Sequence, residues 1–225
     1  MRLLAALHCA SAAPLAAEAP VLALPIDCTL GTTCYIEDYV DADPTPGKQQ
    51  DFSCGLNARD AHKGTDFALL SFDSVAQGIE VRAAAPGTVL RVRDGMVDDI
   101  TMPGVTDQNA CGNAAILDHG DGWQTMYCHM REGSLAVAPG DEGATGDSLG
   151  LVGLSGMTTH PHVHLTVYHN GKVVDPFATD GAQTCDSQPT KTLWADPPTY
   201  FKTGLMTAGF SINVPSLDDV NSGAA

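Results

Sequence analysis

The sequence predicts a mainly β protein with long loops and little helix. Of its 225 residues, 23 are glycine and 14 are proline, while hydrophobic residues make up 44% and charged residues only 17%. That mixture is typical of a folded, turn-rich chain and argues against disorder. From about residue 62 to residue 177, short apolar segments alternate with glycine-rich turns, and no long stretch repeats with the period of a helix. We therefore expect a β core built largely from hairpins.

Residues 1–19 predict a secretory signal peptide. Arg2 supplies a positive charge, residues 3–15 are mostly apolar, and Ala17-Glu18-Ala19 offers a small-x-small cleavage site. The apolar run is too short to span a bilayer, and no later run is long enough. The alternative is a buried N-terminal helix. We expect a periplasmic or secreted protein without a membrane span in the mature chain.

The cysteine count supports export. Cleavage after Ala19 would remove Cys9 and leave an even number of cysteines, which favours three disulfides in an exported chain. These cysteines are Cys28, Cys34, Cys54, Cys111, Cys128 and Cys185. None of them forms a C-x-x-C pair, so we do not expect a structural zinc knuckle.

The chain divides into four segments. After the signal, residues 20–57 predict an extended lead-in tethered by disulfides, and residues 58–180 form the expected β domain. Residues 181–225 are a less regular extension, in which Phe210–Val214 predicts a strand whose partners are absent. The chain can therefore be part of a longer protein.

The net charge of −16 excludes some partners. Such a surface repels nucleic-acid phosphates and anionic membranes, and no basic stripe offsets it. We expect a monomer that binds no nucleic acid, although the sequence does not fix the oligomeric state.

Three stretches predict strand–turn–strand units. They are Val81–Arg93 with a turn at Pro86-Gly87, Ala114–Leu117 and Gln124–His129 around residues 119–122, and Val163–Tyr168 and Lys172–Val174 around Asn170-Gly171.

The second of these units predicts a disulfide. A loop at residues 119–122 would place Cys128 opposite Asn113 and diagonal to Cys111, with both cysteines on one face of the sheet. A diagonal pair is near the limit of disulfide reach. We predict the Cys111–Cys128 bond, and the same alternation sends Tyr127 and His129 to the opposite face. The remaining four cysteines leave three pairings open.

Two distant stretches carry metal-competent side chains. His162 and His164 project from the same face of a strand, because side chains alternate with a period of two. His62 and Asp66 lie at a loop or strand entry, because Gly64 and the following threonine disfavour a helix. A hydrolytic zinc ion takes three such ligands and leaves its fourth position to water.

Each stretch alone is a weak signal. A His-x-His pair is often a surface pair, and a histidine near an aspartate is often only a hydrogen bond. Chance is a poor explanation for both together, in an exported β protein with a third histidine, His129, in Tyr127-Cys128-His129-Met130.

Residues in four segments resemble the signature motifs of the lysostaphin-type zinc metallopeptidases. The segments are His-Lys-Gly-Thr-Asp-Phe-Ala (62–68), Tyr-Cys-His-Met (127–130), Gly-Leu-Ser-Gly (153–156) and Pro-His-Val-His-Leu (161–165). Their order and approximate spacing match, Asp-Pro-Phe at 175–177 is similar to the family's usual close, and the resemblance covers roughly residues 60–178.

The resemblance implies a small antiparallel β-sheet or β-sandwich core with an open, zinc-containing groove. It also implies that one Zn²⁺ ion is bound by His62, Asp66 and His164, with His129 and His162 as unligated catalytic histidines. Members of the family cut peptide bridges or stem peptides in bacterial peptidoglycan. The residues alone leave open which of His162 and His164 binds the metal.

The chemistry follows from such an ion, which lowers the pKa of bound water to about 7 and polarises the scissile carbonyl. A neutral imidazole can take the water's proton, and a protonated one can stabilise the oxyanion or protonate the leaving amine. We favour His162 as base and His129 as oxyanion stabiliser, and the reverse assignment is nearly as good. The other histidines and both tryptophans are expected to be packing or rim residues: His119, His160, His169, Trp123 and Trp194.

The leading hypothesis is an exported zinc endopeptidase that acts on peptidoglycan peptides. The alternative is a non-catalytic relative that activates another cell-wall hydrolase, but all five histidine and aspartate positions are retained here. A carrier module is a third possibility, which export and oxidised cysteines disfavour.

Overall fold

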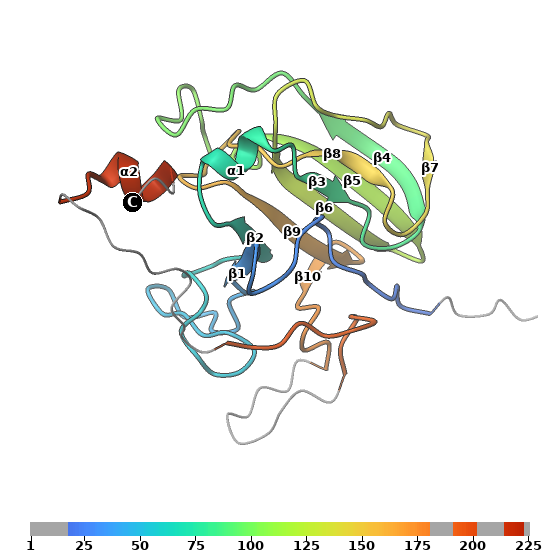
Figure 1. Ribbon diagram of the computed structural model, residues 1–225. Coiled ribbons are helices and arrows are strands. Elements are labelled where there is room, and N and C mark those ends of the chain that lie inside the picture. Colours follow the sequence, from blue (N-terminus) through green and yellow to red (C-terminus); the bar gives the residue numbers. More distant parts are fainter. Residues whose placement is uncertain (1–17, 181–190, 202–213, 223–225) are drawn as a thin grey trace, which may run out of the picture.

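The protein is described here by a computed structural model that covers residues 18–180, 191–201 and 214–222 (Figure 1). The strands are β1 (Cys34–Asp38), β2 (Thr65–Leu69), β3 (Glu80–Arg82), β4 (Gly87–Arg93), β5 (Asn113–Gly120), β6 (Trp123–Met130), β7 (Glu142–Gly143), β8 (Ser148–Leu151), β9 (His162–His169) and β10 (Lys172–Val174), and the helices are α1 (Asp73–Ala76) and α2 (Leu217–Ser222). An eight-stranded antiparallel sheet runs in the order β1-β2-β9-β6-β5-β4-β7 with β10 paired to β9, and β3 pairs with β8 in a second sheet. The prediction of a mainly β fold with an antiparallel core is confirmed.

Strand β9 lies at the centre of the large sheet. Its first half pairs with β2, and its second half pairs with β10 across the Asn170-Gly171 turn. Strand β6 pairs with residues 164–169 of β9. Both turn residues have positive φ, at 52° and 74°, as the tight hairpin turn requires. The predicted β9–β10 hairpin is confirmed.

The β5–β6 hairpin is tighter than expected. Its loop is Asp121-Gly122 alone, because His119 remains in β5, where its ring contacts the carbonyl of Pro86 and the hydroxyl of Thr125. The shorter loop and an irregularity in β6 change the register. Asn113 pairs with Met130, so the predicted placement of Cys128 opposite Asn113 is wrong.

The Cys111–Cys128 disulfide is confirmed, with the two Cα atoms 4.8 Å apart. Cys28 bonds to Cys34, which lies six residues further along the chain. Cys54 is also disulfide-bonded. Cys185 lies outside the described residues, as does most of the predicted strand at residues 210–214.

The two strands expected on either side of Pro86-Gly87 exist but do not pair with each other. Strand β3 pairs with β8, whereas β4 pairs with β5 and β7. The three alanines between them, residues 83–85, are fully buried and carry the chain from the small sheet to the large one. In Figure 1, β3 and β8 lie in front of the β4–β6 part of the large sheet.

The hydrophobic core fills the space between the two sheets. Phe67, Tyr127 and Leu165 from the large sheet belong to the same buried cluster as Val81 and Leu149 from the small one. The phenol of Tyr127 accepts the amide N–H of Ala84 at 2.8 Å, which ties the sheets together. Tyr127 is therefore a packing residue.

The lead-in segment packs directly on the large sheet. Strand β1 pairs with β2 at the sheet edge. Beyond it, Tyr39 and Phe52 form an aromatic cluster with Phe177 and Tyr200, with ring centroids 4.9–5.6 Å apart. The segment therefore borders the strand that carries Asp66.

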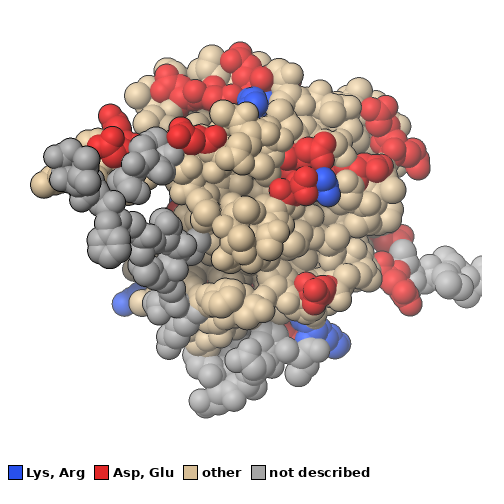
Figure 2. All heavy atoms as spheres, viewed as in Figure 1, with Lys and Arg blue, Asp and Glu red and all other residues tan. Residues whose placement is uncertain are grey.

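Acidic side chains gather in several groups on the face shown in Figure 2, where few basic side chains accompany them. None of the helices in the described ranges has the length and apolarity needed to cross a membrane.

Candidate metal centre

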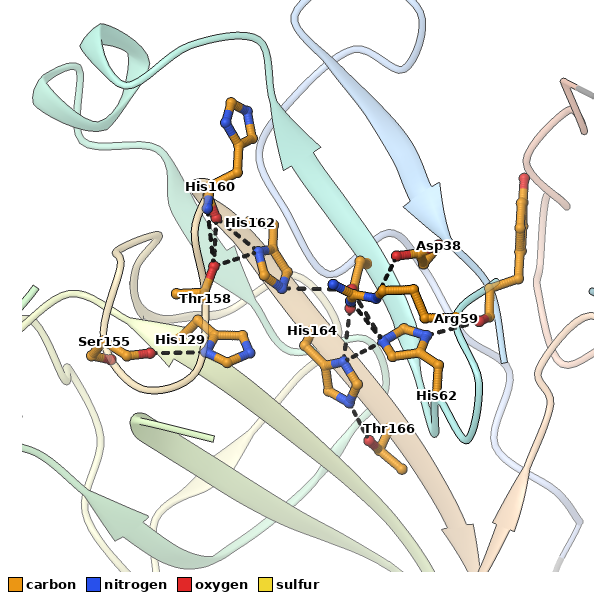
Figure 3. Close-up of polar contacts among 12 residues, drawn as sticks. Asp38, Arg59, His62, His129, Ser155, Thr158, His160, His162, His164 and Thr166 are labelled. Atoms are coloured by element: carbon orange, nitrogen blue, oxygen red, sulfur yellow. Dashed lines mark hydrogen bonds and ion pairs between the residues drawn. The ribbon is translucent and has the colours of Figure 1, made fainter. Parts of the chain in front are cut away.

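The sheet register brings the predicted ligands together. Asp66 on β2 pairs with His164 on β9, and Ala68 pairs with His162. The side chains of Asp66, His162 and His164 therefore lie on the same face of the sheet, opposite the core. His62 precedes β2 and reaches the same point from the side. Figure 3 shows the rings of His62, His129, His162 and His164 turned toward one area.

His62, Asp66 and His164 form a compact donor group. The Nδ1 atom of His164 lies 2.7 Å from Oδ1 of Asp66, and Nε2 of His62 lies 3.1 Å from Oδ2. The two imidazole nitrogens are 3.1 Å apart, and one ligand atom from each residue lies within 4.8 Å of the others. Two nitrogens and one fully buried carboxylate are a donor set that suits zinc and leaves a coordination position open.

The outer nitrogen of each imidazole in this group has an acceptor of its own. Nδ1 of His62 lies 2.8 Å from the carbonyl oxygen of Tyr39, and Nε2 of His164 lies 2.8 Å from the hydroxyl of Thr166. In the tautomer with a proton on the outer nitrogen, the inner nitrogen of each ring would present the lone pair that a metal ligand requires. This is the outer-shell arrangement that orients histidine ligands.

Gly64 explains why the loop before β2 can approach His164. A Cβ at this position would lie 2.6 Å from Cε1 and Nε2 of His164 and 2.6 Å from the carbonyl oxygen of Leu165. Any larger residue would therefore push the ring away from its position. The glycine in His-Lys-Gly-Thr-Asp therefore permits close packing against the His164 ring.

His129 reaches the site because β6 contains a bulge. Between the pairs Ala115–Tyr127 and Asn113–Met130, β6 has one extra residue, and His129 adopts a φ of 62°. Its ring centroid lies 4.6 Å from that of His162. The expectation that His129 shares a face with Tyr127 is therefore wrong, because the bulge turns the imidazole to the other face.

His129 and His162 also hold their outer nitrogens on acceptors. Nδ1 of His129 lies 2.8 Å from the carbonyl oxygen of Ser155, and Nδ1 of His162 lies 2.9 Å from that of His160. Nε2 of His162 is buried without a hydrogen-bond partner among the described residues. It lies 3.6 Å from Oδ2 of Asp66. Such an unpaired buried atom is expected where a reactant binds.

Burial and neighbouring charges give Asp66 a different protonation state from His129 and His162. Burial alone would raise the pKa of Asp66, but His162 and His164, with hydrogen bonds from His164 and His62, hold that pKa well below its ordinary value. Burial lowers the pKa of His162 and, together with the neighbouring imidazoles, holds that of His129 well below its ordinary value. Asp66 is therefore ionised, whereas His129 and His162 are neutral.

The sequence analysis missed Arg59, which lies over the donor group. Its Nη2 contacts Oδ2 of Asp66 at 2.5 Å, and its Nε contacts Asp38 at 2.8 Å. The sequence signal that could have identified Arg59 is its position three residues before His62, although Arg59 belongs to no motif. Thr166 was also missed, yet it lies two residues after His164 and therefore on the same face of β9.

Two hollows flank the donor group. One of about 420 Å³ lies beside His62 and is bounded by Pro44 and Pro46, and another of about 180 Å³ lies beside His162 and is bounded by Met102 and Met157. A chain laid across the site would therefore have room beside His62 and beside His162.

The other histidines do not join the cluster. Nε2 of His160 contacts the carbonyl oxygen of Leu69, and its ring points away from the others in Figure 3, although it borders the smaller hollow. His169 stacks on Trp123 with ring centroids 4.1 Å apart. His119 supports the β5–β6 hairpin. Trp194 is buried in the core.

Comparisons with known proteins identify relatives of this chain. The chain is 34% identical over 116 residues to an uncharacterized metalloprotease of Haemophilus influenzae. The match covers 52% of this chain and 20% of the relative. It is 32% identical over 117 residues to the DD-carboxypeptidase/endopeptidase Mpg of Neisseria meningitidis. This match covers 52% of this chain and 22% of the relative. The chain thus spans about a fifth of the length of these relatives.

Among solved structures, the catalytic domain of the prophage-encoded M23 protein EnpA from Enterococcus faecalis matches with a TM-score of 0.44 at 25% identity. The match covers 70% of this chain and 94% of that one. Residues 60–176, more than half of the sequence, match peptidase family M23, and they include all five of the predicted site residues. The chain therefore belongs to peptidase family M23.

Proposed function

We propose that the protein is an exported zinc metalloendopeptidase that hydrolyses peptide bonds in bacterial peptidoglycan. The observation that carries the proposal is the donor group of His62, Asp66 and His164 with two further imidazoles beside it. A purely structural metal site would be closed by a fourth protein ligand, whereas a hydrolytic site keeps one position for water.

Zinc bound at the three ligands would supply an acidic water molecule and a Lewis acid for the scissile carbonyl. His162 is proposed as the base, because its Nε2 is unpaired and lies 3.6 Å from the carboxylate of Asp66. That negative charge stabilises an imidazolium once His162 has taken a proton. His129 is proposed to stabilise the oxyanion in its protonated form, because its Nδ1 already faces the carbonyl oxygen of Ser155 and the developing negative charge would favour a second proton on Nε2.

The peptidoglycan substrate is supported by the relatives. One is named a DD-carboxypeptidase/endopeptidase, and another similar protein, from Vibrio cholerae, is named a peptidoglycan DD-endopeptidase. The two hollows beside the donor group give an extended peptide room on either side.

Export and the division of the chain belong to the same proposal. Residues 1–19 would be removed as a signal peptide, and residues 20–57 and 181–225 would flank a peptidase domain at 58–180. The Cys28–Cys34 and Cys111–Cys128 disulfides support an oxidising compartment, either the periplasm or the medium.

Incubation with purified peptidoglycan tests the proposal. Mass spectrometry should detect newly freed amino groups, chelation should stop their appearance, and added zinc should restore it. A metal-loaded protein that releases no amino groups, yet stimulates a separate wall hydrolase, would establish the regulator instead.

A further inference from the structure

The smaller hollow beside His162 contains an acidic side chain that neither the metal site nor the proposed chemistry uses. This side chain is Glu37, and the hollow is also lined by Arg59, Met102, Met157 and His160. With a volume of about 180 Å³, it is smaller than the roughly 300–1,000 Å³ of a typical small-molecule site. It therefore suits one substrate side chain.

A bulge in β1 directs Glu37 to this place. Ile36 pairs with Phe67 and Asp38 pairs with Asp66, so Glu37 is the extra residue between two successive pairs. Bulges of this kind re-aim a side chain next to a functional site. The site is therefore bordered by two bulges, one at His129 on β6 and one at Glu37 on β1.

Glu37 lacks a cationic partner within the part of the chain that the structure describes. Arg59 is the nearest candidate, but its Nε is directed to Asp38 and its Nη2 to Asp66. No hydrogen bond or ion pair joins it to Glu37. Burial, followed by the charges of Asp66 and Asp38, raises the pKa of Glu37, and the charges of Arg59 and His160 only partly oppose this rise.

The hollow is lined by two methionines as well as by the polar residues Thr158, Thr159 and His160. Met102 and Met157 are flexible side chains that pack against aliphatic groups of different shapes. An aliphatic side chain ending in an ammonium group would place its methylene groups against the methionines and its charge at Glu37.

We propose that Glu37 is a specificity-determining residue that binds a free amino group on the substrate residue next to the scissile bond. This inference rests on the proposed function, because it assigns the substrate chemistry of the same site. The residue recognised would be a diamino acid whose side-chain amine is not part of a cross-link.

The test compares cross-linked peptidoglycan fragments with free amino groups against the same fragments after N-acetylation. A hydrogen-bonded ammonium–carboxylate pair contributes enough that acetylation should lower kcat/KM of the wild-type protein about ten- to a hundredfold. Glu37→Gln should cut both substrates at the same low rate. Glu142→Gln removes an equal charge from the distant strand β7 and should behave as the wild type does.

Each result decides the matter. Equal cleavage of both substrates by the wild type would overturn the role of Glu37 and leave the endopeptidase proposal intact, whereas no cleavage of either would overturn the endopeptidase proposal itself. If Glu37→Gln still prefers the free amine, the acetyl group excludes the substrate by size and the inference fails. Glu37→Asp keeps the charge one methylene further back and should discriminate to an intermediate degree, so the test holds even if the glutamine variant does not fold.

Discussion

The site contains two pairs of histidines that differ in what surrounds their inner nitrogens. His62 and His164 face the carboxylate of Asp66 at 3.1 and 2.7 Å. His129 and His162 are more deeply buried and have no carboxylate within 3.5 Å among the described residues. Both pairs hold their outer nitrogens on acceptors. On the proposed roles, the position of a single carboxylate decides which histidines bind the metal and which transfer protons.

The largest expected effect separates the two pairs directly. His164→Ala removes a ligand and should abolish metal binding, whereas His129→Ala should retain about one metal ion per chain and lose about 10²- to 10⁴-fold in turnover. Elemental analysis and single-substrate kinetics on the same preparations give both quantities. Equal metal loss from both variants would erase the distinction between the pairs.

A subtler change displaces a ligand without removing it. Gly64→Ala puts a Cβ 2.6 Å from the His164 ring, and the displaced ring should weaken metal affinity about 10- to 100-fold. Gly143→Ala is a matched control, because its nearest neighbour is a side-chain oxygen of Asp147 at 3.9 Å. Competition with a metal-sensitive dye measures the affinity, and an unchanged value for Gly64→Ala would contradict the close packing.

The two pairs of histidines can also be compared by removing threonine hydroxyls that contact their outer nitrogens. Thr166 contacts Nε2 of His164, and Thr158 contacts Nδ1 of His162 at 3.2 Å. Thr166→Val should weaken metal affinity about tenfold. Thr158→Val should leave the affinity unchanged and lower turnover several-fold, because the Thr158 hydroxyl contacts the proposed base His162 and the backbone of His160, but none of the three proposed metal ligands. The comparison would fail if both variants changed the same quantity.

The last comparison concerns the stability of the fold, and it sets two buried carboxylates side by side. Asp66 lies among imidazoles and has a lowered pKa, whereas burial raises the pKa of Asp175 to about 7 despite a hydrogen bond from the amide of Phe177. Since the ordinary value is 3.8, the folded protein retains a proton on Asp175 that the unfolded chain has lost. Asp175 should therefore cost stability as pH rises from about 4 to 7, by at most about 4 kcal/mol.

Asp175→Asn tests this sign. The amide cannot ionise and keeps the acceptor for Phe177, so the stability of the variant relative to wild type should increase as pH rises through this window. Urea unfolding at pH 4.5, 6 and 8 gives the free-energy difference at each pH. A difference that does not change with pH would show that Asp175 is ionised throughout.

The sequence predicted the features that depend on local spacing. The period of two placed His162 and His164 on one face, Asn170-Gly171 predicted its hairpin, and Gly64 with Thr65 correctly argued against a helix before Asp66. These outcomes depend on backbone geometry within a few residues, which the sequence carries directly.

The sequence did not predict features set by distant contacts. The bulge at His129 depends on a hydrogen bond from its amide to the carbonyl oxygen of Cys111, and simple alternation placed the imidazole on the wrong face. The contact between Arg59 and Asp66 depends on how the lead-in segment packs against β2. Strands β3 and β4 joined different sheets because of partners far along the chain.

The disulfide between Cys111 and Cys128 affects when the site can take its final form. Cys111 supplies the acceptor that fixes the His129 backbone, and its sulfur is joined to the residue immediately before His129. If the protein is exported as proposed, both thiols are free while the new chain is still in a reducing cytoplasm, and the disulfide does not yet hold the end of β6 that carries His129. The proposed enzyme would then be completed by oxidation only after export, which would protect the producing cell during synthesis.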